Sequence, residues 1–130
     1  MIFTITGEPK GKQRPRFNKM TGVTYTPSET KAYEKRVKYN YYLQGGRKFD
    51  GAVRIEVWAF MQIPRSASKK HAEELKGAPC TKKPDVDNVL KIVMDGLSGM
   101  AYDDDKQVAD AIIHKRYAEE PRVEVDVQEV

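Results

Sequence analysis

Cysteine, histidine and long hydrophobic runs are all scarce in this sequence. The 130 residues contain one cysteine, Cys80, and two well-separated histidines, His71 and His114. A single cysteine excludes an intramolecular disulfide framework and makes a reducing, cytoplasmic setting the expected one. Because zinc sites draw on several Cys or His ligands, a zinc site is not expected.

Segments that would direct the chain to a membrane are also missing. No apolar run approaches the roughly 20 residues that a membrane-spanning helix needs. The N-terminal "MIFTITGEPKGKQRPR" places its basic residues after its hydrophobic ones, which is the reverse of the order in a secretory signal peptide. We therefore expect no contact with a membrane.

The charge balance is mildly basic, but the charges are unevenly distributed. Lys and Arg number 23 against 19 Asp and Glu, which gives a net charge of +4. The basic residues crowd the first third of the chain, whereas an acidic stretch lies between Lys82 and Val108. A cationic surface beside an acidic cluster suits a polyanionic ligand that is approached through a divalent metal ion.

The spacing of apolar residues predicts one compact α+β domain over residues 1–130. Alternating apolar and polar residues predict strands at 1–6, 52–63, 107–117 and 122–130, the last two forming a closing hairpin. The segment 7–23 carries glycine, proline and charge without periodicity, and we expect it to be a loop.

Three helices are expected. The first begins in a capping box with Thr26 as its N-cap and ends near Gln44, and a short polar helix covers 66–77. The buried stripe of the first helix should consist of Ala32, Tyr33, Val37 and Tyr41. The third helix covers 86–97, and its buried face should consist of Leu90, Val93, Met94 and Leu97.

The stretch "KKPDVDNVLKIVMDGLSGMAYDDDKQV" from Lys82 to Val108 contains two groups of carboxylates. Asp85 and Asp87 open the third helix, and the run 103–105 is D-D-D. Each group has an ordinary structural explanation, helix capping for the first and a solvated turn for the second. Together they supply hard oxygen ligands at the ends of two elements, which suits Mg²⁺ or Mn²⁺. If those ends lie side by side, Asp85 and Asp87 converge on Asp105.

Lys91 lies between these groups, and two interpretations of it stay open. It stands four residues after Asp87 and four before Asp95, so ion pairs on an exposed helix surface would explain it. Beside a scissile phosphate, the same lysine could stabilise developing negative charge or orient the attacking water.

Basic residues recur at nearly alternate positions in "PKGKQRPRFNK". A flexible cationic loop can follow a phosphate backbone, although basic loops are also common solubilising surfaces. The residues that we expect to contact DNA are Lys10, Lys12, Arg14, Arg16, Lys19 and Lys83.

The acidic stretch resembles the signature of the RusA family of Holliday junction resolvases. That signature is K-P-D-x-D-N-L-x-K, then an Asp four residues on, then Y-x-D-D-x-Q-V. The matching residues are Lys83, Pro84, Asp85, Asp87, Asn88, Lys91, Asp95, Tyr102, Asp104, Asp105, Gln107 and Val108. Val89 replaces the usual Leu, and the additional Asp103 leaves Gln107 as the anchor that selects Asp105 as the third acid.

The resemblance implies a small mixed sheet with helices packed on it, a homodimer, and Mg²⁺-dependent paired nicking of four-way DNA junctions in recombination and repair. It assigns the catalytic acids to Asp85, Asp87 and Asp105 and the catalytic lysine to Lys91, with Asp104 as a supporting metal ligand. Two other functions are considered: a non-catalytic basic nucleic-acid-binding module, and a metal-dependent phosphohydrolase that acts on nucleotides.

Overall fold

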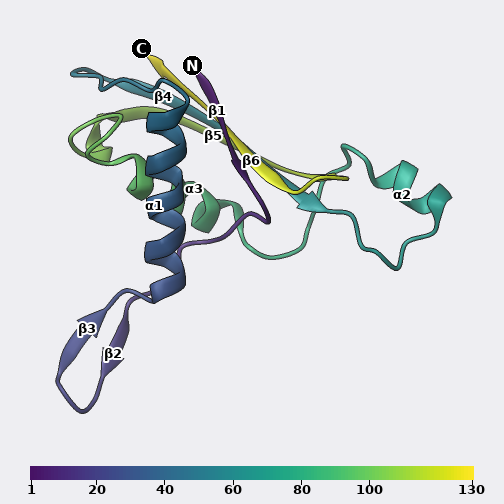
Figure 1. The fold of residues 1–130 in the computed structure, drawn as a ribbon, viewed down its shortest axis with the longest axis horizontal. Coiled ribbons are helices and arrows are strands. Elements are labelled where there is room, and N and C mark those ends of the chain that lie inside the picture. Colours follow the sequence, from purple (N-terminus) through teal and green to yellow (C-terminus); the bar gives the residue numbers. More distant parts are fainter.

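Two long helices cover one face of a four-stranded sheet in the computed structural model, which describes all 130 residues (Figure 1). The elements in chain order are β1 (Ile2–Thr6), β2 (Arg16–Asn18), β3 (Val23–Tyr25), α1 (Ser28–Leu43), β4 (Val53–Gln62), α2 (Lys69–Leu75), α3 (Val86–Leu97), the 3-10 turn η1 (Asp105–Gln107), β5 (Val108–Ala118) and β6 (Arg122–Glu129). The α+β class and the mixed sheet are confirmed. No helix is both long and apolar enough to span a bilayer.

The order of the strands in the sheet is β1-β6-β4-β5, with β4 parallel to β5 and antiparallel to β6. The prediction that the last two strands form a hairpin is therefore wrong, because β4 lies between them. Neighbouring strands are about 4.8 Å apart, so residues 119–121 need to cross only two such spacings over the end of β4. β4, in which apolar and polar residues alternate most regularly, is therefore hydrogen-bonded to a strand on each side, β6 and β5.

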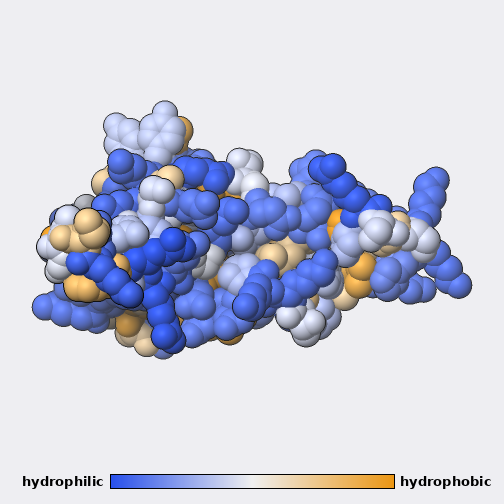
Figure 2. All heavy atoms as spheres, turned by 90° about the horizontal axis from the view of Figure 1, so that it is seen from below, coloured by the Kyte–Doolittle hydropathy of each residue, from blue (hydrophilic) through white to orange (hydrophobic).

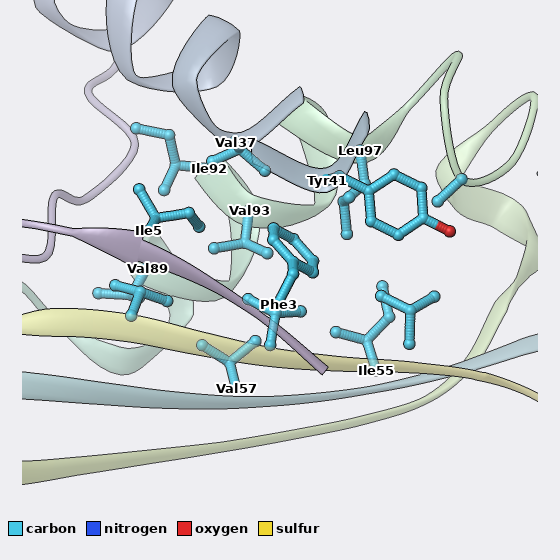
Figure 3. Close-up of a cluster of buried hydrophobic side chains, with 14 of the residues drawn as sticks. Phe3, Ile5, Val37, Tyr41, Ile55, Val57, Val89, Ile92, Val93 and Leu97 are labelled. Atoms are coloured by element: carbon cyan, nitrogen blue, oxygen red, sulfur yellow. The ribbon is translucent and has the colours of Figure 1, made fainter. Parts of the chain in front are cut away.

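The hydrophobic core lies between the sheet and the two helices (Figure 3). Alternate residues of β4 are buried as predicted, from Val53 to Met61. On α1 the buried residues are Thr30, Tyr33, Val37 and Tyr41. Ala32 is exposed, contrary to the prediction, because its neighbour Tyr33 occupies the core-facing position and successive helical residues are about 100° apart.

The buried face of α3 is rotated relative to its predicted position. Val93 and Leu97 are buried as expected, whereas Leu90 and Met94 are half-buried at the margin of the core. The fully enclosed residues are Val89, Ile92, Val93, Gly96 and Leu97. The rotation follows from packing on two sides, since α3 contacts α1 as well as β5.

Two local predictions for the N-terminal third are also corrected. The N-cap of α1 is Pro27 rather than Thr26, and no side chain caps this end, because the extended backbone of Pro27 (ψ 143°) places it just outside the helix. Part of the expected loop forms the β2–β3 hairpin, whose turn is closed by the Gly22 N–H and the Asn18 carbonyl at 2.8 Å. Gly22 has φ +69°, a conformation that glycine adopts readily.

The hairpin and α2 both project from the body of the molecule, in different directions (Figure 1). Every residue of β2 and β3 is exposed. On the face seen in Figure 2, hydrophilic side chains predominate and hydrophobic ones form only small separate patches. This face therefore has the character of a surface in contact with water or with a polar ligand.

Candidate active site

The carboxylates of Asp85 and Asp87 lie free at the start of α3. Asp85 occupies the N-cap position (φ −68°, ψ 152°), but its side chain accepts no capping hydrogen bond. Both residues are exposed, and neither takes part in any ion pair of the chain. The carboxylate of Asp85 is thus not used for helix capping, and both side chains keep their oxygen lone pairs available.

A polar groove of about 560 Å³ runs beside the first of these carboxylates, that of Asp85. Apart from Pro9, Gly11 and Pro84, its lining residues are charged or carry an amide: Lys10, Lys12, Gln13, Lys83, Asp85 and Asn88. The groove therefore brings three predicted DNA-binding lysines to one predicted metal ligand.

The N-terminal loop forms one wall of this groove because it packs closely on the first turn of α3. The Lys12 N–H donates to the Asn88 carbonyl at 2.8 Å. A Cβ at position 11 would lie 2.7 Å from Cβ of Pro84, so only glycine allows this approach. Gly11 and Lys12 are thereby held against the acidic end of the helix.

Lys12 differs from its basic neighbours because its ammonium group is paired inside the protein. It forms ion pairs with Glu34 of α1 and, at 3.1 Å, with Asp95 of α3. Burial lowers the pKa of Lys12, but the hydrogen bonds to Glu34 and Asp95 outweigh it, so the pKa is raised above its ordinary value. A contact between Lys12 and DNA stays a prediction, whereas its joining of the two helices is a structural fact.

Replacement of Lys12 by methionine is expected to lower the free energy of unfolding by about 1–2 kcal/mol, because Glu34 and Asp95 lose a hydrogen-bonded cation. The contribution is fully present below pH 10.5 and is lost only as the pH rises through the higher folded-state pKa. Thermal unfolding followed by circular dichroism measures the effect. Lys10→Met is the matched control: Lys10 is exposed, so its loss should change stability by no more than about 0.5 kcal/mol. Equal stabilities of the two variants would contradict this assignment.

Lys91 connects α3 to the acidic turn that follows it. Its Nζ lies 3.1 Å from Oδ1 of Asp95 and 3.2 Å from Oδ2 of Asp105. The hydrogen bonds to Asp95 and then Asp105 raise the pKa of Lys91 above its ordinary value, despite partial burial. The side chain is therefore a cation at neutral pH, and Asp105 is held beside Lys91, which lies one helical turn after Asp87 on α3.

The acidic turn is held by Gln107. Its Nε2 donates to the carbonyls of Phe49 (3.0 Å) and Gly51 (2.9 Å), while its Oε1 accepts the Asp103 N–H at 2.9 Å. Asp103 forms an ion pair with Lys48. Gln107 is therefore a positioning residue for the turn, a role that its place in the sequence motif does not reveal.

Asp104 has a local role in the same turn. Its Oδ1 accepts the backbone N–H of Lys106 at 2.9 Å, which caps η1. This hydrogen bond is the main reason why the pKa of Asp104 is lowered. Asp104 is therefore ionised at neutral pH, and one of its oxygens is already engaged.

Within one chain, no three Asp, Glu, His or Cys side chains come close enough to hold a metal ion together. The residues nevertheless fit Mg²⁺ in part, since this ion usually takes one or two carboxylates and completes its shell with water and phosphate. Asp85 and Asp87 are unpaired carboxylates of this kind, and Asp105 forms an ion pair with Lys91. Convergence of all three on one ion stays a prediction.

The remaining predicted DNA contacts lie on or beside the hairpin. Arg14, Arg16 and Lys19 are exposed, and none of them forms an ion pair with a carboxylate of the chain. Phe17 (61% exposed) and Met20 (94% exposed) stand among them. The hairpin thus presents cations and apolar side chains together, a combination that proteins use on nucleic-acid backbones and bases.

One part of the site was not found by reasoning from the sequence. Asp95 accepts hydrogen bonds from both Lys12 and Lys91 and so links the basic loop to the acidic turn. Glu34 completes this network from α1. The motif contains Asp95, but the sequence carries no signal for Glu34, because its contact with Lys12 is made across 22 residues of chain.

Comparison with known proteins agrees with these observations. The model of the family "Endodeoxyribonuclease RusA" matches residues 6–128. YqaN of Bacillus subtilis (strain 168), an uncharacterized protein, is 37% identical over 135 residues, which cover 98% of this chain and 95% of YqaN. The family match includes the whole acidic motif, the basic loop and both β4 and β5, and the chain therefore belongs to the RusA family of endodeoxyribonucleases.

Proposed function

We propose that the protein is a Mg²⁺-dependent endodeoxyribonuclease that resolves Holliday junctions by paired nicking, as a homodimer, in DNA recombination and repair. The observation that carries this proposal is the pair of free carboxylates at the start of α3, Asp85 and Asp87, the first of which lines a polar groove together with Lys10 and Lys83. A dimer fits the task, because a two-fold symmetric enzyme presents equivalent sites to the two strands that must be cut.

The metal would be held by Asp85, Asp87 and Asp105, with Asp104 in support; Mn²⁺ prefers the same oxygen ligands. When bound, such an ion polarises the scissile phosphate and makes water a better nucleophile. In this proposal the protein's own contribution is to leave the carboxylates of Asp85 and Asp87 without competing partners and to place Asp85 in a groove that admits a phosphate backbone.

Lys91 acts electrostatically in this proposal. Its pKa is raised above 10.5 by Asp95 and Asp105, so it carries a proton at neutral pH and does not serve as a general base there. A fixed ammonium group next to the acidic cluster can stabilise negative charge that develops on the phosphate. Asp95 is a positioning residue that orients this ammonium group.

The DNA backbone would be bound by Lys10, Lys83 and the cations of the hairpin. Each phosphate that these residues neutralise releases counterions and makes binding more sensitive to salt. Lys12 contributes less directly, because Glu34 and Asp95 already neutralise it. Apart from Pro9 and Pro84, the groove has no apolar side chain, which argues against a nucleotide phosphohydrolase, since a base pocket is mostly apolar.

The proposal is tested by incubating the protein with a four-way junction, a linear duplex of the same sequence and free nucleotides, each with Mg²⁺, Mn²⁺ or EDTA. We expect paired nicks in the junction with either metal, little cleavage of the duplex, and junction binding without cleavage in EDTA. Binding without cleavage in every buffer would instead identify a non-catalytic binding module. Hydrolysis of nucleotides in place of the junction would identify a phosphohydrolase.

A further inference from the structure

One half of strand β5 is an uncovered edge of the sheet. β5 pairs with β4 alone and has no strand on its other side. Near its C-terminal end, the segment 77–80 covers this side: Gly77 and Cys80 donate their N–H groups to the carbonyls of Tyr117 (2.9 Å) and Lys115 (3.1 Å). No comparable backbone hydrogen bond reaches residues 109–114.

The hydrogen bonds of the covered half show which backbone N–H and C=O groups of β5 point away from β4. Lys115 and Tyr117 point their carbonyls outward, and backbone groups alternate in direction along a strand. The N–H and C=O groups of Ala111 and Ile113 therefore also point outward, where the chain offers them no partner. All four residues from Ala109 to Ile112 are exposed.

This edge has little of the protection that isolated edge strands usually carry. The run "ADAII" contains no lysine and no proline, and Asp110 is its single charge. Lysine, proline or a covering segment normally prevents such an edge from pairing with another strand. Here the covering segment 77–80 protects only the other half.

We propose that the free half of β5 pairs antiparallel with the same segment of a second copy, around a two-fold axis at Ile112. The inference rests on the proposed function in one respect, the homodimer, and adds the surface through which that dimer forms. A two-fold contact of this kind closes on itself, and the covered half of β5 stops further chains from joining the edge.

The side chains favour this axis over its neighbours. An axis at Ile112 sets Ala111 of one copy opposite Ile113 of the other, so that the outward N–H and C=O groups of both are satisfied. It also sets Ile112 against Ile112, and the carboxylate of Asp110 against the imidazole of His114. An axis at Ala111 would place Asp110 against Ile112 and leave that carboxylate without a partner.

His114 is already oriented for such a contact. Its ring stacks on Trp58 with centroids 5.6 Å apart, and its Nε2 lies 2.8 Å from Oε2 of Glu56. These contacts hold the imidazole on the face of the sheet that carries no helix. The side chains of Asp110 and Ile112 lie on the same face, because alternate residues of a strand share a face. The contact between the carboxylate of Asp110 and the imidazole of His114 is therefore repeated on both sides of the axis.

An irregularity in β5 limits the length of the contact. The β4–β5 register shifts between Val53, which pairs with Val108, and Arg54, which pairs with Asp110. Ala109 is the extra residue of this bulge, and bulged strands bend. The bend lets the strand of the second copy leave the edge before it meets the segment 77–80.

Ile112→Cys tests the axis directly. At the two-fold axis a residue faces itself in a non-hydrogen-bonded pair, with Cα atoms about 4.5 Å apart, a separation that a disulfide tolerates. We expect rapid cross-linking of this variant under mild oxidation, without DNA or metal. Tyr39→Cys, at an exposed position of α1, is the control and should remain mostly uncross-linked. Native Cys80 is buried and stays in place.

Ile112→Lys tests the same surface without a new covalent bond, because it sets two ammonium groups against each other. Ile112 is 37% exposed, so folding should survive, and circular dichroism checks this. We expect wild-type protein to sediment as a dimer and this variant to dissociate at least about 10-fold more readily. A monomeric wild type, an Ile112→Lys variant that dimerises normally, or an Ile112→Cys variant that cross-links no faster than Tyr39→Cys would each overturn the proposal. Nuclease activity does not enter these measurements, so failure of the proposed function would be seen separately.

Discussion

Replacement of Asp87 by asparagine should leave junction binding intact and slow junction cleavage about 10³-fold, the equivalent of several kcal/mol of transition-state stabilisation. Asp87 is exposed in the first turn of α3 and forms no ion pair in the chain, so its replacement should remove no folding contact. Asparagine keeps the size of the side chain but removes the negative charge that a divalent ion requires. The loss should therefore appear in the rate of cleavage alone.

Asp103→Asn is the matched control for this experiment. Asp103 lies in the same acidic run but is not one of the motif residues, and its carboxylate is paired with Lys48, so we expect the variant to cut nearly as well as wild type. Single-turnover cleavage of a labelled junction measures the rate, and a gel-shift titration in EDTA measures binding. An Asp87→Asn variant that cuts at the wild-type rate would refute the metal-site interpretation. Weakened binding of that variant in EDTA would mean that Asp87 has a structural role.

Gly96→Ala is expected to destabilise the fold by about 1–3 kcal/mol, the usual consequence of adding volume to a packed core. A Cβ at this position would lie 2.7 Å from Cβ of Val37 and 3.0 Å from the Glu34 carbonyl oxygen. Both atoms are close to the backbone of α1 and cannot rotate away, so the two helices must move apart. Alanine favours a helix over glycine by about 1 kcal/mol, which we expect the clash to outweigh.

The control for this variant is Gly51→Ala, because a Cβ at Gly51 would meet no atom within 4 Å and its φ is not positive. Urea unfolding should give nearly the wild-type stability for Gly51→Ala and a clear loss for Gly96→Ala. Separation of α1 from α3 would also stretch the contact that Lys12 makes with Glu34 and Asp95, so we expect cleavage to fall as well. An increase in stability for Gly96→Ala would show that the gain in helix propensity exceeds the cost of the clash between the new Cβ and α1.

Local periodicity predicted most elements of this fold well. The alternation of β4 identified its buried residues correctly, because the side chains of a strand follow a fixed period of two. The amphipathic pattern of α3 identified the helix but misplaced its face, with Leu90 and Met94 at the margin. The buried face of α3 is rotated because α3 also packs on α1, and the periodicity of α3 alone does not indicate that contact.

The sequence by itself determined which chemical groups are present: the order of the acids around Lys91, the basic loop, and the elements that carry them. Only the tertiary structure decided which of these groups are engaged. It paired Lys12 with Glu34 across 22 residues, left the carboxylate of Asp85 uncapped, and placed β4 between the last two strands. The physical reason is that periodicity and capping act over a few neighbouring residues, whereas strand order and ion pairs between elements depend on how the whole core closes.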